Sequence, residues 1–334
     1  MTIDQGSIPE HAGGLLKNQK TWIVLFLLLC TLIAHGRSVT YPFVGYDDHL
    51  FVAEEVPFYK TISAETFRYV FLDLGTRDSN WVPMARLSHL LDYKLYGLDA
   101  PGHHVTNILF HLANVLLLWL AMLRMTGAKW RSAAVAMLLA VHPIHVESVA
   151  WVSERRDVLS LFFALLAILN HTRHVRSPGV GRYVLTTLLI ALAIMSKPTM
   201  VTLPCVMILL DGWPLGRWTQ AWRRMDRWRA LLMLAIEKIP WLALSVGAAV
   251  LTRWAQNAAI VAPEFLPMNQ RLIRVPVAYI DYLKMFFWPV NLSPLYASRY
   301  NWSVLQAVIG LTLLFGMAYL IFRLWKSRSY LMTG

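Results

Sequence analysis

The sequence predicts an all-α polytopic membrane protein with about eight transmembrane helices, within a range of about six to ten, and a large structured first extracytoplasmic loop. Hydrophobic residues make up 57% of the 334 positions and charged residues only 15%. An ordinary soluble domain is ~45–50% apolar and ~25% charged. The net charge is +12, but the basic residues stand in short clusters between apolar runs. This pattern is typical of membrane proteins rather than of nucleic-acid binders.

The first membrane span is predicted at residues 21–36, an uninterrupted apolar run. The polar residues 1–20 form a tail on the cytoplasmic side, because Lys17 and Lys20 directly precede the span. A retained span is favoured over a cleaved signal peptide, since the tail is long and acidic and no good small-residue cleavage site follows the run.

Residues 37–103 are predicted to form the first extracytoplasmic loop, because they contain no apolar run of membrane length and are rich in acids, prolines and aromatics. Apolar residues recur at spacings of three and four over 64–72 and 85–97. These spacings predict two helices on or near the membrane surface. The loop is therefore expected to be structured.

The other predicted spans are apolar runs at 105–123, 132–141, 157–169, 183–195, 199–210, 230–251 and 303–324. Basic clusters predict that the connections at 124–131, 171–182 and 217–229 are cytoplasmic. A full crossing by 275–290 would place the basic tail 325–334 outside. We therefore expect 275–290, which contains Asp281 and Lys284, to be a re-entrant or interfacial helix on the outer face. Both termini are then cytoplasmic, and the membrane domain covers 21–324.

Asp47 and Asp48 are adjacent carboxylates just beyond the first span. Such a pair can accept a proton from a hydroxyl group, hold a divalent cation, or cap a surface helix. Taken alone, the pair favours a helix cap or a solvated loop. Its significance depends on what else the outer face presents.

The outward connection 142–158 is crowded with polar groups: His142, His145, Glu147, Glu154, Arg155, Arg156 and Asp157. If the segment is helical, Glu147 and Glu154 share a face, and the arginines can bind an anion. Two histidines and a glutamate are also ligand types that zinc accepts, but the i, i+4 histidine pair of helical zinc sites is absent. Phosphate or acceptor binding is favoured over structural ion pairing, and both over a metal.

Lys197 interrupts two apolar runs and is followed by Pro198. It either extends to the membrane interface or supplies a fixed positive charge to a phosphate. Further polar residues in 80–115 include Arg86 and His104. His104 shares a helix face with two other polar residues of the second span, and hydrogen bonding between helices is favoured there over a catalytic role.

Several segments occur in an order and spacing that resemble one protein family. They are "YDD", "NWVPMARLSHLLDYKLYGL…GHHVTNILFHLAN", "AVHPIHVESVAWVSERRDVLS", "SKPTMVTLP", "LLDGWPLGR", "EKIPWLALS" and "YIDYLKMFFWPVNLSPLY". From about residue 40 to about residue 300 the chain resembles the membrane portion of the transmembrane and tetratricopeptide-repeat O-mannosyltransferases and their bacterial relatives. The most specific segment is "HPIHVESVAWVSERRD".

The resemblance implies a GT-C-type glycosyltransferase whose active site opens outward beside the first large loop. Its donor is a polyprenyl-phosphate sugar, with mannose as the candidate sugar. An inverting transfer to the hydroxyl of an extracytoplasmic acceptor, expected to be a protein, requires a base and a stabilised leaving phosphate. The resemblance gives the base role to Asp47 or Asp48. We prefer Asp47, with Asp48 as a supporting acid or cation ligand.

The outward-facing cations Arg155, Arg156 and Lys197 are the expected phosphate ligands. The expected supporting polar residues are His142, His145, Glu147, Glu154, Asp157, Arg86 and His104. No cofactor is certain from the sequence, and a divalent cation at Asp48 stays open. The expected location is the inner membrane if the source is bacterial, with the site on the extracytoplasmic side.

One departure from the family pattern keeps other functions open. The chain shows no helical-pair repeat with a period near ~34 residues, so a separate repeat protein is a candidate partner. A transporter or flippase of a lipid-linked sugar would use the same cations without breaking a bond. A non-catalytic membrane subunit that pairs with a repeat protein is the other alternative.

Overall fold

The computed structural model describes residues 10–53, 56–73, 81–224, 226–256, 267–293 and 303–324, and every regular element in these ranges is helical. The longer helices are α1 (Glu10–His35), α3 (Ala64–Leu72), α4 (Pro83–Tyr96), α5 (Ala100–Thr126), α6 (Lys129–Val141), α8 (Arg155–Arg176), α9 (Val180–Ser196), α10 (Leu203–Gly212), α11 (Arg217–Arg224), α12 (Arg227–Ala255), α13 (Met268–Phe287) and α14 (Val304–Leu324). The shorter ones are η1 (Gly36–Thr40), η2 (His49–Ala53), α2 (Val56–Tyr59), η3 (Pro143–His145), α7 (Val146–Ala150), η4 (Val152–Glu154) and η5 (Pro198–Thr202).

Within the described ranges, five stretches are long and apolar enough to cross a membrane: Asn18–Thr40, Ala100–Thr126, Val152–Arg176, Arg227–Ala255 and Val304–Leu324. Two bent helix pairs, Lys129–Ala150 and Pro198–Arg223, raise the number to seven if each pair is one span. The apolar helix α9 is shorter. The predicted all-α polytopic fold is confirmed, while the number of about eight crossings stays a prediction.

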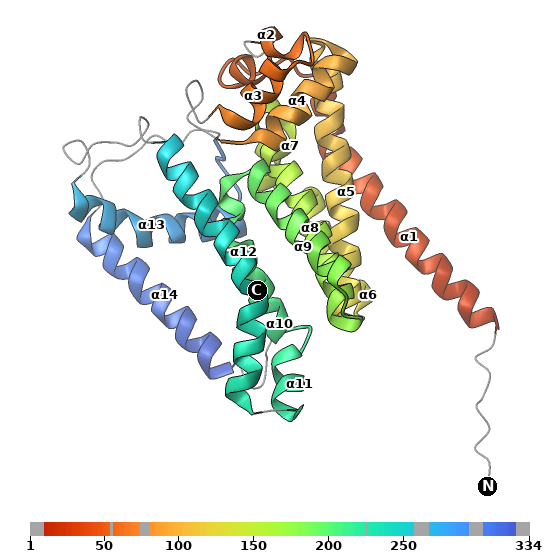
Figure 1. Ribbon diagram of the computed structural model, residues 1–334, viewed down its shortest axis with the longest axis vertical. Helices are drawn as coiled ribbons and strands as arrows, with labels where there is room; N and C mark the ends of the chain where they lie inside the picture. The colour runs from red at the N-terminus through yellow and green to blue at the C-terminus, as the bar shows by residue number, and fades with distance from the viewer. Residues whose placement is uncertain are drawn as a thin grey trace.

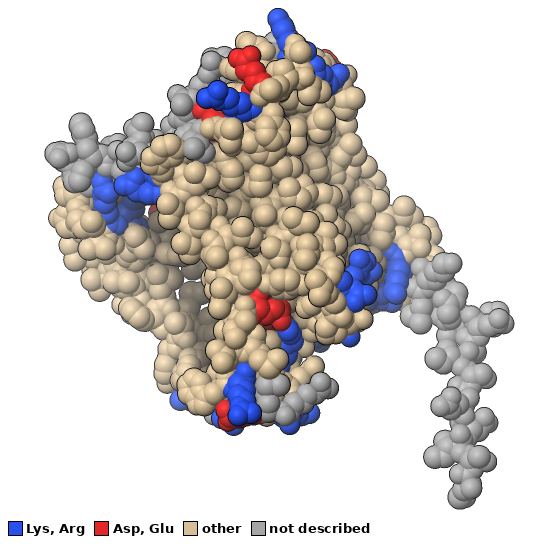
Figure 2. All heavy atoms as spheres, in the orientation of Figure 1, with Lys and Arg blue, Asp and Glu red and all other residues tan. Residues whose placement is uncertain are grey.

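The helices form a bundle with two distinct ends (Figure 1). Helices α2, α3 and α4 lie together at one end, and the α5–α6 turn, the α8–α9 turn and α11 lie at the opposite end. The three basic connections predicted to be cytoplasmic are therefore on the side away from the first loop. On the face seen in Figure 2, a broad area of other residues separates charged side chains at the upper end from those toward the lower end, and a further basic group lies at the left edge.

Small side chains allow the central helices to pack closely. Helix α5 packs against α6 and α8, and α8 against α9. Val115 of α5 meets Ala136 and Ala140 of α6 in a buried cluster that also includes Leu27 of α1. Small residues at such interfaces let helix backbones approach each other, which is how helices associate in lipid. This tight part of the bundle supports the outer connections described below.

The first loop is helical where its periodicity predicted helices. Ser63 is the N-cap of α3, and its Oγ accepts a hydrogen bond of 3.2 Å from the backbone N–H of Thr66. Pro83 is the first residue of α4. Such caps satisfy backbone donors that a helix terminus leaves free. The predicted helices at 64–72 and 85–97 are confirmed as α3 and α4.

Helix α13 differs from its neighbours in direction. It runs across the line of α12 and α14 in Figure 1 and packs mainly against α14, where Gly310 lies against the backbone of Pro276. It is not among the described helices that are long and apolar enough to cross a membrane. The prediction that 275–290 does not span fits this geometry, and its position on the outer face stays a prediction.

Candidate functional site

The N-terminal end of α8 lies at the end of the bundle that carries the first loop, which we call the outer end because it is predicted to face outward. It brings most of the predicted site residues together. The segment 142–158 is not one helix, because Pro143 interrupts it and the chain passes through η3, α7 and η4 before α8 begins at Arg155. The condition under which Glu147 and Glu154 would share a helix face is therefore not met. Instead, the breaks fold the segment back on itself, and Ser148 donates a hydrogen bond of 2.8 Å to the Asp157 carboxylate.

The two adjacent aspartates have different environments. Asp48 is fully buried, and its Oδ1 accepts hydrogen bonds from the Ser153 backbone N–H at 2.8 Å and the Ser153 hydroxyl at 2.5 Å. Its Oδ2 accepts a 2.8 Å bond from the Val44 N–H. Asp48 therefore links the loop after α1 to η4, and both of its carboxylate oxygens accept hydrogen bonds from these two segments.

Asp47 is half-buried rather than closed in. Among the residues that the structure describes, its carboxylate has no hydrogen-bond partner, and it interacts electrostatically with Arg156. A carboxylate that is held in place by its buried neighbour, and is still accessible, can receive a proton from a bound hydroxyl. Asp47 is thus the accessible aspartate of the pair, and Asp48 is the one that anchors the loop.

Arg155 is committed to the interior. It is fully buried, and its Nη1 pairs with the Asp92 carboxylate. Its Nε donates to Asn107 Oδ1 at 2.7 Å and its Nη2 to the His103 carbonyl at 2.8 Å. Burying a guanidinium requires such complete pairing. Arg155 thus joins α8 to α4 and α5, and this arrangement leaves its guanidinium without a donor directed at a ligand.

Arg156 and Lys197 form the accessible cationic pair of the site. Arg156 Nε donates to Glu154 Oε1 at 3.1 Å, its Nη2 pairs with the same oxygen, and the guanidinium lies 5.6 Å from the Phe51 ring centroid. Lys197 Nζ is 3.3 Å from Glu154 Oε2 and also pairs with Asp157. Their side chains keep 16% and 24% of their surface exposed.

Glu147 completes the group, which we call the outer cluster: Asp47, Glu147, Glu154, Arg156, Asp157 and Lys197. Glu147 is exposed and interacts electrostatically with both cations and with Glu154 and Asp157. Four carboxylates face two cations, so the formal charge of the cluster is −2. Since Glu154 and Asp157 hold the two cations, the carboxylates of Asp47 and Glu147 are the ones left uncompensated.

A mostly apolar pocket of about 490 Å³ adjoins the outer cluster. Its walls come from the loop after α1, from η3 and α7, and from α13 and the residues that follow it. Tyr46 and Trp151 line it with ring centroids 6.2 Å apart, and Glu147 is the charged residue in its lining among the described residues. A site with a charged edge and an apolar wall can hold a ligand that has both kinds of surface.

The other predicted supporting residues lie around this site in structural roles. His142 Nε2 lies 2.9 Å from the Phe286 carbonyl, which links η3 to α13. The His145 ring contacts that of His111 in a tilted arrangement and that of His142 edge-on. His104 is buried in α5. Arg86 is buried in the first loop, where it donates to the Asp73 carbonyl at 3.1 Å. The structure therefore places Arg86 in the first loop's own packing and outside the outer cluster.

His89, which sequence reasoning did not include among the site residues, lies beneath the cluster. It is fully buried in α4, and its ring centroid lies 6.5 Å from that of Phe51. Both of its ring nitrogens lack a hydrogen-bond partner among the described residues. Burial, with a contribution from the Arg155 and Arg156 charges, lowers the pKa of His89 well below its ordinary value. The imidazole is therefore neutral at pH 7.

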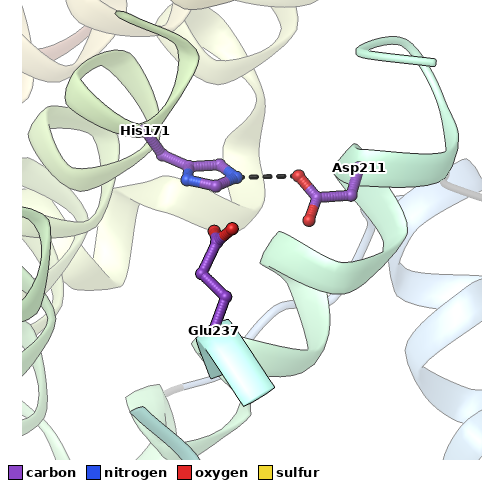
Figure 3. A group of neighbouring side chains, drawn as sticks. All are labelled: His171, Asp211 and Glu237. Atoms are coloured by element: carbon purple, nitrogen blue, oxygen red, sulfur yellow. Dashed lines mark hydrogen bonds and ion pairs between the residues drawn. The ribbon is translucent and has the colours of Figure 1, made fainter. Parts of the chain in front are cut away.

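A second group of ionisable residues lies at the other end of α8. His171 of α8, Asp211 of α10 and Glu237 of α12 point toward one another (Figure 3), and in the described ranges they are the one set of three His or carboxylate ligands close enough to share a metal ion. His142, His145 and Glu147 do not converge in this way. The inner group was not predicted from the sequence.

Two further residues already pair with the carboxylates of this group. Lys238 Nζ lies 2.8 Å from Asp211 and 2.7 Å from Glu237, and Arg217 contacts the same two carboxylates at 2.9 and 2.6 Å. The two cations balance the formal charges of the two carboxylates. A divalent cation would add two uncompensated charges to a buried site, which is strongly unfavourable. We call these five residues the inner network.

The fold and the outer cluster define a polytopic all-α membrane protein with a charged site at one end of its bundle. The chain is similar to Protein O-mannosyl-transferase Tmtc1 of Drosophila melanogaster, with 33% identity over 147 residues, which is 44% of this chain and 17% of that protein. It is 30% identical over 208 residues to Protein O-mannosyl-transferase Tmtc2 of the same organism, covering 58% of this chain and 22% of that protein. Protein O-mannosyl-transferase TMTC3 of Mus musculus is 36% identical over 133 residues, 37% of this chain and 14% of that protein.

These similarities confirm the resemblance to this group of proteins that the sequence motifs predicted. The chain spans less than a quarter of the length of these relatives. No family model matches it, and no solved structure matches it either.

Proposed function

We propose that this protein is a membrane glycosyltransferase of the GT-C type that transfers a sugar, mannose in the first instance, from a polyprenyl phosphate to a hydroxyl group of an extracytoplasmic protein. The observation that carries the proposal is the accessible carboxylate of Asp47 beside Arg156, which shares Glu154 with Lys197 at the outer end of the bundle. The names of the similar proteins support the reaction class.

Each residue of the outer cluster has a role in the proposed reaction. The Asp47 carboxylate takes the proton from the acceptor hydroxyl as that oxygen bonds to the anomeric carbon. The bond from the anomeric carbon to the phosphate oxygen breaks on the opposite face, so the transfer inverts the configuration. Arg156 and Lys197 stabilise the negative charge that develops on the leaving phosphate. Asp48 positions Asp47 through its bonds to Ser153 and Val44.

This assignment refines the roles predicted from the sequence. Arg155 passes from the phosphate ligands to the structural residues, because all three of its nitrogens already bond within the protein. Glu154 and Asp157 hold the two remaining cations in place, at the cost of partly neutralising them. A donor phosphate would compete with these carboxylates for Arg156 and Lys197.

The test is a transfer assay with the purified full chain in lipid nanodiscs, using radiolabelled polyprenyl-phosphate mannose and a synthetic threonine peptide. We expect wild-type protein to attach label covalently and Asp47→Asn to lose about 10²- to 10⁴-fold in rate, the usual contribution of a general base. Asp99→Asn is the matched control, because Asp99 is exposed, lies in the same region and makes no side-chain cap bond. Wild-type rates in Asp47→Asn, or label that only changes leaflet, would overturn the proposal.

A further inference from the structure

Glu147 is the residue of the outer cluster that the proposed reaction leaves without a role. It lines the apolar pocket, it is exposed, and its carboxylate has no hydrogen-bond or ion-pair partner in the described part of the chain. The two cations nearest to it are already bound by Glu154 and Asp157. A carboxylate that is free of protein partners and lies at the edge of an apolar pocket is available to pair with a positive charge on a ligand.

The pocket begins at the residue that precedes the proposed base. Tyr46 lines the pocket and immediately precedes Asp47 in the chain, and Glu147 of α7 lines the same pocket. An acceptor whose hydroxyl reaches Asp47 can therefore extend its neighbouring groups over Tyr46 into the pocket. The aromatic rings of Tyr46 and Trp151 offer flat apolar surface to the backbone or side chains of a peptide.

The charge of the whole cluster favours the same kind of occupant. With a formal charge of −2, the site repels an acidic peptide and attracts a basic one. The aromatic walls add to this attraction, because arginine stacks on aromatic rings and pairs with carboxylates through a planar fork.

We propose that Glu147 selects the acceptor: it binds a cationic side chain, arginine or lysine, that lies a few residues from the acceptor hydroxyl. This inference deepens the proposed function and rests on it for the identity of the acceptor as a polypeptide. Glu147 is then a specificity residue and takes no part in bond making or breaking.

The experiment measures peptide affinity first, without any donor. Fluorescently labelled threonine peptides, with one arginine moved through the positions around the threonine, are titrated into the full chain in nanodiscs and compared with citrulline peptides of the same shape. We expect the best arginine position to bind about two- to tenfold more tightly than citrulline, the range for an ion pair that is partly shielded from water. Glu147→Gln should abolish this difference, and Glu147→Lys should favour a glutamate peptide.

The matched control is Glu65→Gln, because Glu65 is an exposed glutamate on α3 and lies outside the pocket lining. It should keep the arginine preference. Equal binding of arginine and citrulline peptides by the wild type would overturn the inference. So would a preference that appears only with added Mn²⁺, since Glu147 would then bind a metal ion rather than the acceptor.

Transfer kinetics separate this inference from the proposed function. If label is transferred equally to arginine and citrulline peptides, the selection by Glu147 is wrong and the glycosyltransferase survives. If peptides bind with the expected charge preference but no label is transferred to any of them, the proposed function is wrong and the pocket's preference survives. Competition by free polyprenyl phosphate that removes peptide binding in both wild type and Glu147→Gln would assign the pocket to the lipid and overturn the inference.

Discussion

The two ends of α8 carry two ionic groups of opposite design. In the inner network two carboxylates and two cations balance, and Asp211 and Glu237 each pair with both Lys238 and Arg217. Asp211 and Lys238 are buried, whereas Arg217 and Glu237 keep 17% and 18% of their side-chain surface exposed. The outer cluster is partly exposed and has two more carboxylates than cations. Buried charge is tolerated only when it is fully paired, whereas an unbalanced, accessible group is left ready for a ligand. The comparison predicts that removing a cation from the inner network reduces stability, and that under the proposed function removing one from the outer cluster reduces activity.

The largest expected effect is on stability, at the inner network. Lys238→Met should lower the free energy of unfolding by about 3–5 kcal/mol, because it leaves buried carboxylates short of one cation. Thermal unfolding of the full chain in detergent, followed by circular dichroism, measures the change. The double variant Lys238→Met with Asp211→Asn should recover part of the loss, since it removes one charge of each sign. If Lys238→Met alone were as stable as wild type, the inner network would not stabilise the packing of these helices.

The two aspartates of the outer loop provide the next test. Asp48→Asn should cost about 1–3 kcal/mol, because a neutral amide cannot accept all three hydrogen bonds from Val44 and Ser153 and one buried donor loses its partner. Asp47→Asn should change stability by less than about 0.5 kcal/mol, as for a surface position. The same thermal unfolding assay compares them. Equal losses of stability would contradict the division into a supporting and an accessible aspartate.

The asymmetry between the aspartates also marks the limit of what the sequence predicts. Apolar periodicity located α3 and α4 and most membrane helices, because each is a local property of about 10–20 residues. The sequence also grouped Glu154, Arg156 and Lys197, since the charge rule placed their segments on one side. Nothing local distinguishes Asp47 from Asp48, because the distinguishing partner, Ser153, is 105 positions away.

The same limit explains the missed inner network and the changed role of Arg155. Arg155 and Arg156 are adjacent and look equivalent, but α8 turns one toward Asp92 in the interior and the other toward the site. The inner network was visible in part, since Glu237 and Lys238 interrupt an apolar span. A rule that treats every charged residue within a span as a candidate for pairing would have found both. It would not have identified Asp211 as their partner.

His89, which lies near the outer cluster, should make the stability of the protein depend on pH. Because its pKa in the folded protein lies well below the ordinary value of 6.5, the unfolded chain binds a proton more readily once the pH falls below that value. The free energy of unfolding should therefore fall as the pH is lowered from 6.5, by up to about 1.4 kcal/mol per pH unit from this one group. Unfolding curves of wild type and His89→Phe between neutral and mildly acidic pH test it. The variant should lose part of the pH dependence, and an unchanged slope would contradict a buried neutral imidazole.

The smallest expected effect on stability comes with a clear effect on activity. Lys197→Gln should change the free energy of unfolding by only about 0–1 kcal/mol, because its ion pairs with Asp157 and Glu154 are partly exposed to water. Transfer from polyprenyl-phosphate mannose should nevertheless fall by about 10²-fold, the typical loss when one charge that stabilises a leaving group is removed. Lys20→Gln is the matched control, because Lys20 is an exposed lysine on α1, the helix whose opposite end leads to the site. If Lys197→Gln destabilised the protein as strongly as Lys238→Met and transferred sugar normally, the two ionic groups would have the same structural role. Stability and activity measured on one pair of lysine variants thus separate an ion pair that holds helices together from one that keeps a cation in place for a substrate.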